Sequence, residues 1–370
     1  MNTFPKRVLF IVNTMNLGGA ETFVMKIFRK TDRTKIVFDF LINELDEDYY
    51  ILEIKNLGGK IYPGCSKSKN LVKSLFTVFR VVYDNHYTIV FRLAEHPLSS
   101  LDLLSAKLGG AKRTIARSTN TSAEGALSNI TAMLARKLMN IVTTVKLAPS
   151  TEAAEWIFGK KAVALNKTII LKNAIDLDVY KYNLEERQKV RKEFHLENKY
   201  IIGHIGRFNN QKNHTFLIRI FSEIKKYDNN AVLLLVGQGE LEKNIRLQVK
   251  QMGLQKCVIF AGIRTDIPGI LSAMDIFVFP SLYEGMPNVV IEAQATGLPA
   301  VISDTITKEV KLTDLIKFCS LNDDVQKWTN TILNSKKRDD KKCVKYQNIL
   351  RKEGYSIEKS VKILEKIFME

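Results

Sequence analysis

Short apolar runs rich in Val, Ile and Phe alternate along this chain with longer segments of helical period. Such alternation is typical of parallel sheets whose strands are joined by crossover helices. We expect strands at residues 7–13, 38–43, 88–93 and 113–118 in the first half of the chain, and at 200–206, 231–237, 257–262, 276–281 and 299–303 in the second. The pattern predicts an α/β fold made of two doubly wound, Rossmann-like domains.

The boundary between these domains is expected in a segment without a strand pattern. A chain of 370 residues is longer than one ordinary hydrophobic core can organise. Residues 173–198 separate the two groups of strands and turn into a charged helix. We predict domains over residues 1–175 and 176–370, the second including the linker and the C-terminal helix. Because doubly wound domains bind ligands at the carboxyl ends of their strands, we expect the domains to face each other across a crevice.

Cysteine usage and hydropathy indicate the compartment. The four cysteines are scattered and show neither CxxC spacing nor a dense framework, which argues against disulfides and structural zinc and favours the cytoplasm. No apolar stretch approaches the roughly 18 residues that a membrane span requires. We therefore expect a protein that is soluble or peripheral on a membrane.

The net charge of +17 is unevenly distributed. Residues 1–175 hold 25 Lys and Arg against 14 Asp and Glu, whereas the remainder holds 31 against 25. Such an excess could serve nucleic acid, an anionic membrane or phosphorylated small molecules. No nucleic-acid-binding module is recognisable, so we expect no nucleic-acid partner.

Two amphipathic segments bear on the membrane. Residues 70–87 and 128–147 carry apolar side chains at helical spacing, with Lys or Arg nearby. Most such helices pack on a sheet. The basic character of this half nevertheless favours an anionic lipid surface, so we predict peripheral binding at the inner face of the cell membrane.

The loop after the expected strand at 200–206 carries two cations beside a helix start. Arg207 and Lys212 flank the turn from which a helix is expected to begin at Asn213. Free backbone N–H groups and the helix dipole both favour negative charge at such a position. The loop suits a diphosphate, although two solvated surface cations would give the same pattern.

Two further loops of the second half carry weaker signals. Gly237 and Gly239 lie at the end of the strand expected at 231–237, but no third glycine completes a dinucleotide fingerprint, so they indicate only a tight turn. After the next strand, the backbone around Ile263 and Arg264 could hold a flat base by main-chain hydrogen bonds.

The stretch PSLYEGMPNVVIEAQATGLP, residues 280–299, places two glutamates eight positions apart. Gly285 permits a tight backbone and Pro287 suits the first turn of a helix, so the N–H groups that follow should point toward a ligand. Carboxylates repel phosphate but accept hydrogen bonds from hydroxyls. Glu284 would accept them from a sugar and Glu292 from a ribose. The alternative is that Glu284 caps the helix and Glu292 is an exposed helical residue.

Several motifs together resemble a known family. GRFNNQKN, GQGEL, FPSLYEGMPNVVIEAQATGLP and VISDTITKEV are similar to the motifs of retaining family 4 glycosyltransferases of GT-B fold, particularly those that build bacterial capsular and extracellular polysaccharides. The resemblance continues in GKKAVALNKTIILKNAIDLDVY and, less closely, in NLGGAETFVMKIFR, so it covers most of the chain. It favours the binding roles of the two glutamates over the capping alternative. It also implies an acceptor-side N-terminal domain and a C-terminal domain that binds a nucleotide sugar.

The resemblance implies roles for individual residues. Arg207 and Lys212 would bind the donor diphosphate, and Glu284 would bind the transferred sugar. A UDP-sugar is the expected donor, no separate cofactor is expected, and the acceptor would be a lipid-linked saccharide or an oligosaccharide. The donor-binding candidates are Gly18, Gly19, Gly237, Gly239, Ile263, Arg264, Gly285, Met286, Pro287, Asn288, Val289 and Glu292.

One stretch departs from the family pattern. Relatives often show His-Ser-His-Asn where this chain has Arg117, Ser118, Thr119 and Asn120, so Arg117 and Asn120 are acceptor-side candidates. Of the five histidines, His96 alone follows a strand in a way that would face the expected crevice, unless it is an ordinary loop histidine. Glu95 beside it could handle the acceptor's proton. The catalytic candidates are Glu284, Arg207, Lys212 and His96.

The sequence contains two loose metal-binding patterns and is compatible with two other functions. DED at 46–48 and DLD at 176–178 match a loose DxD pattern, but we expect no metal, because Arg207 and Lys212 would neutralise the leaving diphosphate. A nucleotide-sugar 2-epimerase would share the architecture. A binding protein that has lost catalysis would account for the altered residues 117–120.

Overall fold

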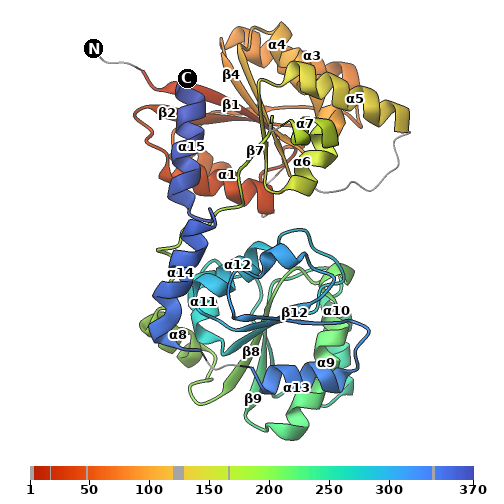
Figure 1. Ribbon diagram of the computed structural model, residues 1–370, viewed down its shortest axis with the longest axis vertical. Coiled ribbons are helices and arrows are strands. Elements are labelled where there is room, and N and C mark those ends of the chain that lie inside the picture. The colour runs from red at the N-terminus through yellow and green to blue at the C-terminus, as the bar shows by residue number, and fades with distance from the viewer. Residues whose placement is uncertain (1–3, 17, 47–48, 120–128, 166, 336–337) are drawn as a thin grey trace. The chain divides into compact units, whose positions relative to one another are not determined.

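The protein forms two compact units in the computed structural model, which describes residues 4–16, 18–46, 49–119, 129–165, 167–335 and 338–370 (Figure 1). The first unit comprises Met1–Asp176 together with Gly354–Glu370, and the second comprises Leu177–Glu353. We refer to them as unit 1 and unit 2.

Unit 1 is built on a seven-stranded parallel sheet with the order β3-β2-β1-β4-β5-β6-β7. Its strands are β1 (Lys6–Val12), β2 (Ile36–Ile42), β3 (Ile61–Pro63), β4 (Ile89–Ala94), β5 (Arg113–Ser118), β6 (Val145–Ala148) and β7 (Ile169–Ile170). Its helices are α1 (Gly19–Lys30), α2 (Ile51–Asn56), α3 (Leu71–Asp84), η1 (Pro97–Ser99), α4 (Ser100–Leu108), α5 (Asn129–Val142), α6 (Thr151–Phe158), α7 (Lys160–Ala164) and α15 (Ile357–Met369).

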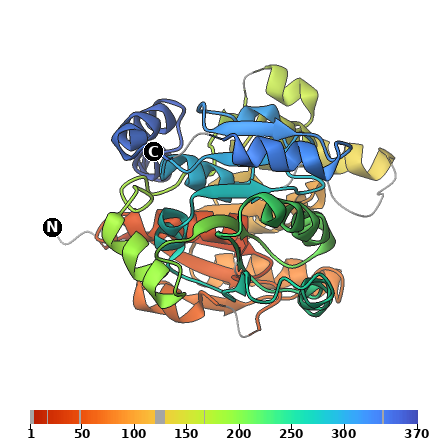
Figure 2. The same ribbon diagram turned by 90° about the horizontal axis from the view of Figure 1, so that it is seen from below.

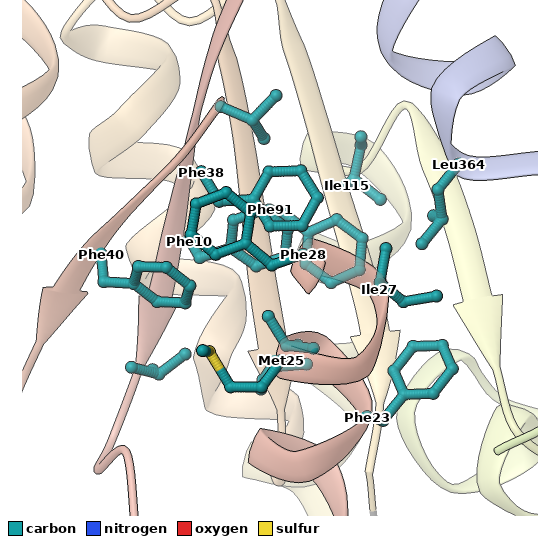
Figure 3. Packing of buried hydrophobic residues seen from close by; sticks show 14 of the residues in the cluster. Phe10, Phe23, Met25, Ile27, Phe28, Phe38, Phe40, Phe91, Ile115 and Leu364 are labelled. Carbon is teal, nitrogen blue, oxygen red and sulfur yellow. The ribbon is translucent and has the colours of Figure 1, made fainter. Parts of the chain in front are cut away.

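Helices cover both faces of this sheet, which explains the continuous apolar runs in its central strands. Every residue of β2 and of β4 is buried, as expected for parallel strands enclosed on two sides. One face packs against α1, α2 and α15, and the other against α3, α4, α5 and α6. Figure 3 shows the aromatic centre of the first face, where Phe10 stacks on Phe91 at 4.6 Å between ring centroids and Phe28 stacks on Phe38 at 4.8 Å.

The C-terminal helix belongs to unit 1, which differs from the predicted C-terminal domain over 176–370. The apolar face of α15 supplies the reason. Val361, Leu364 and Phe368 are buried in the same cluster as the sheet phenylalanines, and the ring of Phe368 meets that of Phe38 edge to face at 5.8 Å. Leu364 lies at the edge of the cluster in Figure 3.

Unit 2 is built on a six-stranded parallel sheet with the order β10-β9-β8-β11-β12-β13. Its strands are β8 (Tyr200–Ile205), β9 (Ala231–Val236), β10 (Val258–Phe260), β11 (Ile276–Phe279), β12 (Ala300–Ser303) and β13 (Ile316–Cys319). Its helices are α8 (Leu184–Glu193), η2 (Asn210–Lys212), α9 (His214–Tyr227), α10 (Glu242–Gln251), α11 (Ile267–Ala273), α12 (Asn288–Ala295), η3 (Lys308–Val310), α13 (Val325–Leu333), η4 (Asp340–Lys342) and α14 (Cys343–Lys352).

The strand order places the ligand-binding edge of each sheet. Helices lie on both faces of the second sheet (Figure 2), with α9, α10 and α13 forming one layer. In both sheets the order reverses beside the first strand, between β1 and β4 and between β8 and β11. Such a reversal separates the loops at the carboxyl ends of the two strands and leaves room for a ligand.

All nine predicted strands are present, with ends shifted by a few residues. The sequence pattern missed β3, β6, β7 and β13, which have two to four residues and are too short to show a period. Residues 128–147 were predicted as one amphipathic segment, but helix α5 ends at Val142 and β6 begins at Val145. Of the helices in the described part of the chain, none has the length and apolar character needed to span a bilayer.

Candidate functional site

The carboxyl edge of unit 2 carries a closely paired lysine and glutamate. Lys212 Nζ lies 2.5 Å from Glu284 Oε1, and only 16% and 12% of the two side chains are exposed. The same ammonium lies 4.6 Å from the centre of the Phe279 ring. A partly desolvated cation in this position keeps a stronger field than one in open water.

Local sequence explains how the two residues meet. The side chain of Asn209 accepts a hydrogen bond from the Lys212 amide and starts η2, and Asn213 then takes the left-handed conformation (φ 54°) before α9 begins at the next residue. Gln211 ties this turn to the loop after β11, because its carbonyl accepts a bond from the Leu282 amide and its side chain donates to the Tyr283 carbonyl. The predicted cation and the first predicted glutamate are thereby brought together.

The helix after Glu284 begins one residue later than predicted. Pro287 is the N-cap of α12 in an extended conformation rather than part of its first turn, and no side chain caps the helix. Gly285 is exposed, whereas Met286, Asn288 and Val289 are half-buried. The Val290 amide donates to the Pro287 carbonyl, and in the absence of a side-chain cap the dipole of α12 favours negative charge at this helix start.

Glu292 lies inside α12 with 7% of its surface exposed. The alternative of an exposed helical glutamate is therefore wrong. A carboxylate is rarely buried without partners, so its position requires polar groups around it. Its proposed role toward a ribose stays a prediction.

Arg207 differs from Lys212, although both follow β8. Its side chain is 72% exposed, and its nearest carboxylate is that of Glu240, with 3.4 Å between Nη2 and Oε2. Such an exposed pair contributes little stability and leaves the guanidinium free to move. Lys212 is therefore the partly buried cation of this loop, and Arg207 is the exposed one.

The glycines after β9 are required by backbone packing. Gly237 has a φ of 129°, and a Cβ there would lie 2.2 Å from the carbonyl oxygen of Gly206. A Cβ at Gly239 would lie 2.5 Å from the carbonyl oxygen of Phe208. Both glycines hold the loop after β9 against the loop that leads to Lys212.

The candidates after β10 present backbone rather than charge. Ile263 is half exposed. The guanidinium of Arg264 is engaged by the carboxylates of Asp266 and Glu193, whose hydrogen bonds raise its pKa. The Arg264 side chain is therefore anchored, and a base-binding role for this loop would fall to its main chain.

Two buried histidines lie beneath the Lys212 loop and were not predicted. His204 on β8 stacks on Phe279, and its Nδ1–H donates to the Val278 carbonyl at 2.9 Å. His214, the first residue of α9, lies edge to face with His204 at 4.7 Å between ring centroids. Burial lowers the pKa of both, that of His214 to about 4 with a further contribution from the Lys212 charge. Both rings are neutral at pH 7.

In unit 1, the predicted glycines begin α1. Gly18 is its extended N-cap without a side-chain cap bond, and the exposed Gly19 is its first residue. This helix start follows β1 and lies at the carboxyl edge of the sheet. The carboxylate of Glu21, in the first turn, lies against Gly18, so a negative group is already present at this helix start. The phosphate-binding role of the two glycines stays a prediction.

Glu95 and His96 follow β4 and share a cluster with Trp156 of α6. The indole Nε1–H of Trp156 donates to the Glu95 carbonyl at 3.2 Å, and the imidazole of His96 lies edge to face with the indole at 5.9 Å. Arg136 of α5 lies over the same indole at 5.3 Å. The predicted loop is therefore held by two side chains that sequence reasoning missed.

Arg117 is not a surface residue. Only 1% of it is exposed, its guanidinium lies 4.0 Å from the centre of the Phe23 ring, and it donates to the Leu171 carbonyl and to Asn173 Oδ1. Burial lowers its pKa to about 9. The prediction that Arg117 contacts the acceptor is therefore corrected, since strand β5 points this side chain into the interior. Asn120 lies outside the described residues.

A buried ionic network beside β4 was also missed. Asp102 Oδ2 accepts hydrogen bonds from Arg92 Nε at 2.7 Å and from Lys67 Nζ at 2.6 Å. Arg92 also donates to Asn13 Oδ1 and to the Ile11 carbonyl. The sequence signal for this network was Arg92, a single arginine within the apolar run of β4.

The two DxD stretches have different outcomes. In the DLD stretch, Asp176 pairs with Lys30 at 2.7 Å and Asp178 with Arg351 at 3.1 Å. Glu47 and Asp48 of the DED stretch lie outside the described residues.

Known proteins resemble the chain in sequence and in fold. Residues 199–334 match the family described as Glycosyl transferases group 1. The chain is 31% identical over 376 residues to glycosyltransferase EpsF of Bacillus subtilis, an alignment that covers 100% of this chain and 97% of EpsF. It is 30% identical to an Escherichia coli galactosyltransferase named for UDP-Gal and α-D-GlcNAc-diphosphoundecaprenol, over 63% of this chain and 62% of that protein.

Solved structures share the fold at low identity. Anabaena Alr3699/HepE in complex with UDP has a TM-score of 0.78 and 16% identity, and the match covers 98% of this chain and 99% of HepE. WaaG, a glycosyltransferase of lipopolysaccharide biosynthesis, has a TM-score of 0.68 and 14% identity, with 98% and 99% coverage. The two parallel sheets described above thus have the GT-B fold.

Proposed function

The chain belongs to the group 1 glycosyltransferases of family 4 type, which act in polysaccharide synthesis, and on that premise we propose that it moves a sugar from a UDP-sugar to a lipid-linked saccharide with retention at the anomeric carbon. Unit 2 would bind the donor at its carboxyl edge. The pairing of Lys212 with Glu284 beside the reversal of strand order carries this proposal.

The chemistry separates two tasks at that edge. The bond from C1 of the sugar to the diphosphate oxygen breaks, a bond from C1 to the acceptor oxygen forms, and the proton of the acceptor hydroxyl passes to the departing UDP. Lys212 stabilises the negative charge on the departing diphosphate, aided by the uncapped start of α12. Glu284 accepts hydrogen bonds from the sugar hydroxyls and fixes the ring.

Glu292 and the exposed Arg207 complete the proposed donor site. The buried carboxylate of Glu292 accepts hydrogen bonds from the ribose hydroxyls, and the guanidinium of Arg207 binds the diphosphate when the donor is present. The main chain around Ile263 contacts the base. No separate cofactor takes part.

Metal independence belongs to the same proposal. Lys212, Arg207 and the helix dipole supply the positive charge that a divalent cation provides in other transferases. The carboxylates of the DLD stretch are paired with basic side chains in the structure. Activity should therefore persist in excess EDTA, and a loss restored by Mg²⁺ or Mn²⁺ would contradict this part of the proposal.

We further propose that the protein works in the cytoplasm at the inner face of the membrane, in capsule or exopolysaccharide synthesis. A lipid-linked acceptor resides in a bilayer, and two of the relatives are named for diphosphoundecaprenol-linked acceptors. Helix α3 exposes an apolar stripe in which Val72 and Phe76 are 76% and 57% exposed. The basic character of residues 1–175 suits anionic lipid.

A donor screen followed by a transfer assay tests the function. Nucleotide sugars that bind the folded state raise the midpoint of thermal unfolding, and the sugar that raises it most is then offered with a polyprenyl-diphosphate-linked saccharide. The expected result is a lengthened acceptor with free UDP. Epimerised donor in the absence of acceptor would favour a 2-epimerase, and donor binding without turnover would favour a binding protein.

A further inference from the structure

The loop after β4 carries positive charge that the donor chemistry does not use. Arg136 Nε donates to the Trp156 carbonyl at 2.9 Å, and its guanidinium carbon lies 5.3 Å from the indole centre. Across the described residues, Arg136 has no carboxylate partner. The two terminal nitrogens of a guanidinium held in this way form a fork that suits an oxyanion.

His96 adds a hydrogen-bond donor beside this fork. Its Nδ1 accepts a bond from the Leu98 amide at 3.1 Å, so the proton of the neutral ring is on Nε2. Burial and the charges of Arg136 and Lys67 lower its pKa, which keeps the ring neutral at pH 7. His96 therefore presents an N–H group and has no free lone pair with which to act as a base.

Lys67, in the loop after β3, brings a second cation beside the loop after β4. It shares the Asp102 Oδ2 atom with Arg92, so two cations face one carboxylate. Arg92 is buried and spends its other donors on carbonyls and Asn13, whereas part of Lys67 remains exposed. The cations here are Arg92, Lys67 and Arg136, and the carboxylates are those of Asp102 and Glu95. Three positive charges against two negative charges leave one positive charge uncompensated.

From this arrangement we propose that Arg136, Lys67 and the Nε2–H of His96 form a binding subsite for a phosphate oxyanion of the acceptor. The inference rests on the proposed function, because it assigns the diphosphate of a lipid-linked saccharide to unit 1. All three groups donate and none accepts, which fits a fully ionised diphosphate and not a neutral sugar. Trp156 is a positioning residue, since it fixes Arg136 from one side and the Glu95 carbonyl from the other.

Binding of a simple prenyl diphosphate tests the subsite without turnover. Geranyl diphosphate is titrated into the full-length protein by calorimetry, with excess UDP present to fill the donor site. Arg136→Gln and Lys67→Met should each weaken binding by about tenfold, as expected for loss of a charge-assisted hydrogen bond. Geraniol, which lacks the diphosphate, should not bind measurably. Binding that is unchanged in both variants would overturn the proposal.

Matched variants separate charge from folding. Lys137→Gln removes the same charge from the neighbouring, exposed position of α5 and should leave geranyl diphosphate binding unchanged. Equal weakening by Lys137→Gln would show that only the general charge of α5 matters and would contradict a defined subsite. The thermal midpoints of Arg136→Gln and Lys137→Gln should match that of the parent protein, whereas Lys67→Met also removes a partner of the buried Asp102 and should lower it. The shift produced by UDP should be the same in all three variants.

Two further readouts distinguish the source of the anion and the role of His96. Inorganic diphosphate that binds as tightly as geranyl diphosphate would indicate a site for a free ion and would contradict an acceptor subsite. In transfer assays, Arg136→Gln should raise the acceptor KM with a smaller change in kcat, and His96→Gln should retain more activity than His96→Ala, because glutamine supplies an N–H donor. If Arg136→Gln transfers sugar with an unchanged acceptor KM, the subsite proposal is contradicted while the proposed function stands. If no acceptor is ever lengthened, the proposed function is contradicted, whatever the binding data show.

Discussion

The two sheets have the same strand order over their first six strands, but they bury different chemistry. Strands of unit 1 carry Asp39, Arg92 and Arg117 with 0%, 2% and 1% exposure. The six strands of unit 2, all of them described, bury no charged side chain, and their prominent buried polar group is the neutral ring of His204. The sheet of unit 1 therefore buries ions among its strands, whereas the charged groups of unit 2 lie in loops and helices outside an apolar sheet.

This difference has a physical consequence for the two edges. A buried ion must be compensated by partners that cannot move, so the ionic network of unit 1 fixes the loops after β1, β3 and β4 in one arrangement. The loops of unit 2 rest on apolar strands, and their cations range from Lys212, with 16% of its side chain exposed, to Arg207, with 72% exposed. A charged ligand can compete for them with their carboxylate partners. We therefore expect rigid loops at the carboxyl edge of unit 1 and more adaptable loops at that of unit 2.

The largest expected effect is on the buried network of unit 1. Asp102→Asn keeps the shape of the side chain but leaves Arg92 buried with no carboxylate. Breaking a buried pair in this way typically costs about 3–5 kcal/mol. Urea denaturation should show that loss in the free energy of unfolding of unit 1.

Asp84 offers the matched control for this substitution. It pairs with Arg80 on the exposed surface of α3 at 2.9 Å, with 58% and 45% of the two side chains exposed. Asp84→Asn should change the free energy of unfolding by less than about 0.5 kcal/mol. If Asp102→Asn were no more destabilising than Asp84→Asn, the contrast between the sheets would have no energetic meaning.

The second effect concerns turnover and unit 2. Lys212→Met should reduce kcat/KM by about 10²–10³-fold, because it removes a preorganised charge from the leaving group. The fold should survive, since the lysine is in a loop and does not belong to the core. Initial rates with saturating donor and circular dichroism measure the two properties.

Lys226→Met is the control for Lys212→Met. Lys226 pairs with Glu223 at 2.6 Å on α9, but its side chain is 66% exposed. It should leave kcat/KM within about twofold of the parent value. Equal losses of kcat/KM in the two variants would show that the effect comes from the overall charge, and would contradict the assignment of Lys212 to the proposed site.

The sequence could predict those parts of the molecule that depend on local pattern. The strand runs predicted the α/β class and nine of the strands, and the motifs pointed separately to Lys212 and to Glu284. The structure brings these two residues together because the carboxyl ends of β8 and β11 are neighbours in this fold. The place of α15 could not be predicted, since its apolar face is compatible with either core. The inward direction of Arg117 was also hidden, because whether a polar residue at the end of a strand faces water depends on what packs over it.

The clusters that surround His96 could not be predicted for a related reason. Lys67, Asp102 and Arg136 are far apart in the chain and have no fixed spacing to one another. Only the pairing of β4 with its neighbours and the packing of α4, α5 and η1 bring them to one loop. The positions of these residues in the sequence alone do not predict such tertiary contacts.

A third effect follows from the neutral histidines of unit 2. The pKa of His214 is about 4 in the folded protein, below the ordinary value of 6.5, so the unfolded state binds a proton first as pH falls. The stability that this gives is complete above pH 6.5 and is lost as pH falls toward 4. Between pH 7 and pH 5 the loss from this group is about 2 kcal/mol.

His214→Phe isolates that contribution. Phenylalanine keeps the stacking on Phe208 and does not titrate, so the variant should lose less stability than the parent between pH 7 and pH 5 in urea denaturation. His86→Asn is the control, because His86 is exposed and asparagine tolerates its φ of 56°. A His214→Phe profile parallel to that of the parent would contradict the assignment of acid sensitivity to this ring.

The smallest effect concerns the surface of unit 1. Val72, Phe76, Phe79 and Tyr83 follow one another at helical spacing on α3, and the rings stack in sequence at 6.3 and 5.7 Å between centroids. The opposite face of the helix buries Ser74, Val78 and Val82 against the sheet, so this stripe is not needed for the core.

Because inserting part of a phenylalanine into a bilayer interface is worth roughly 1–2 kcal/mol, Phe76→Ser should weaken binding to anionic vesicles by about tenfold. Leu247→Ser on α10, where the leucine is 55% exposed, is the matched change in unit 2 and should leave vesicle binding unaltered. Co-sedimentation at low and high salt, with zwitterionic vesicles as a further control, measures both. Equal binding of the two variants would show that the lipid surface does not discriminate between the units, and charge alone would then have to account for any attraction to the membrane.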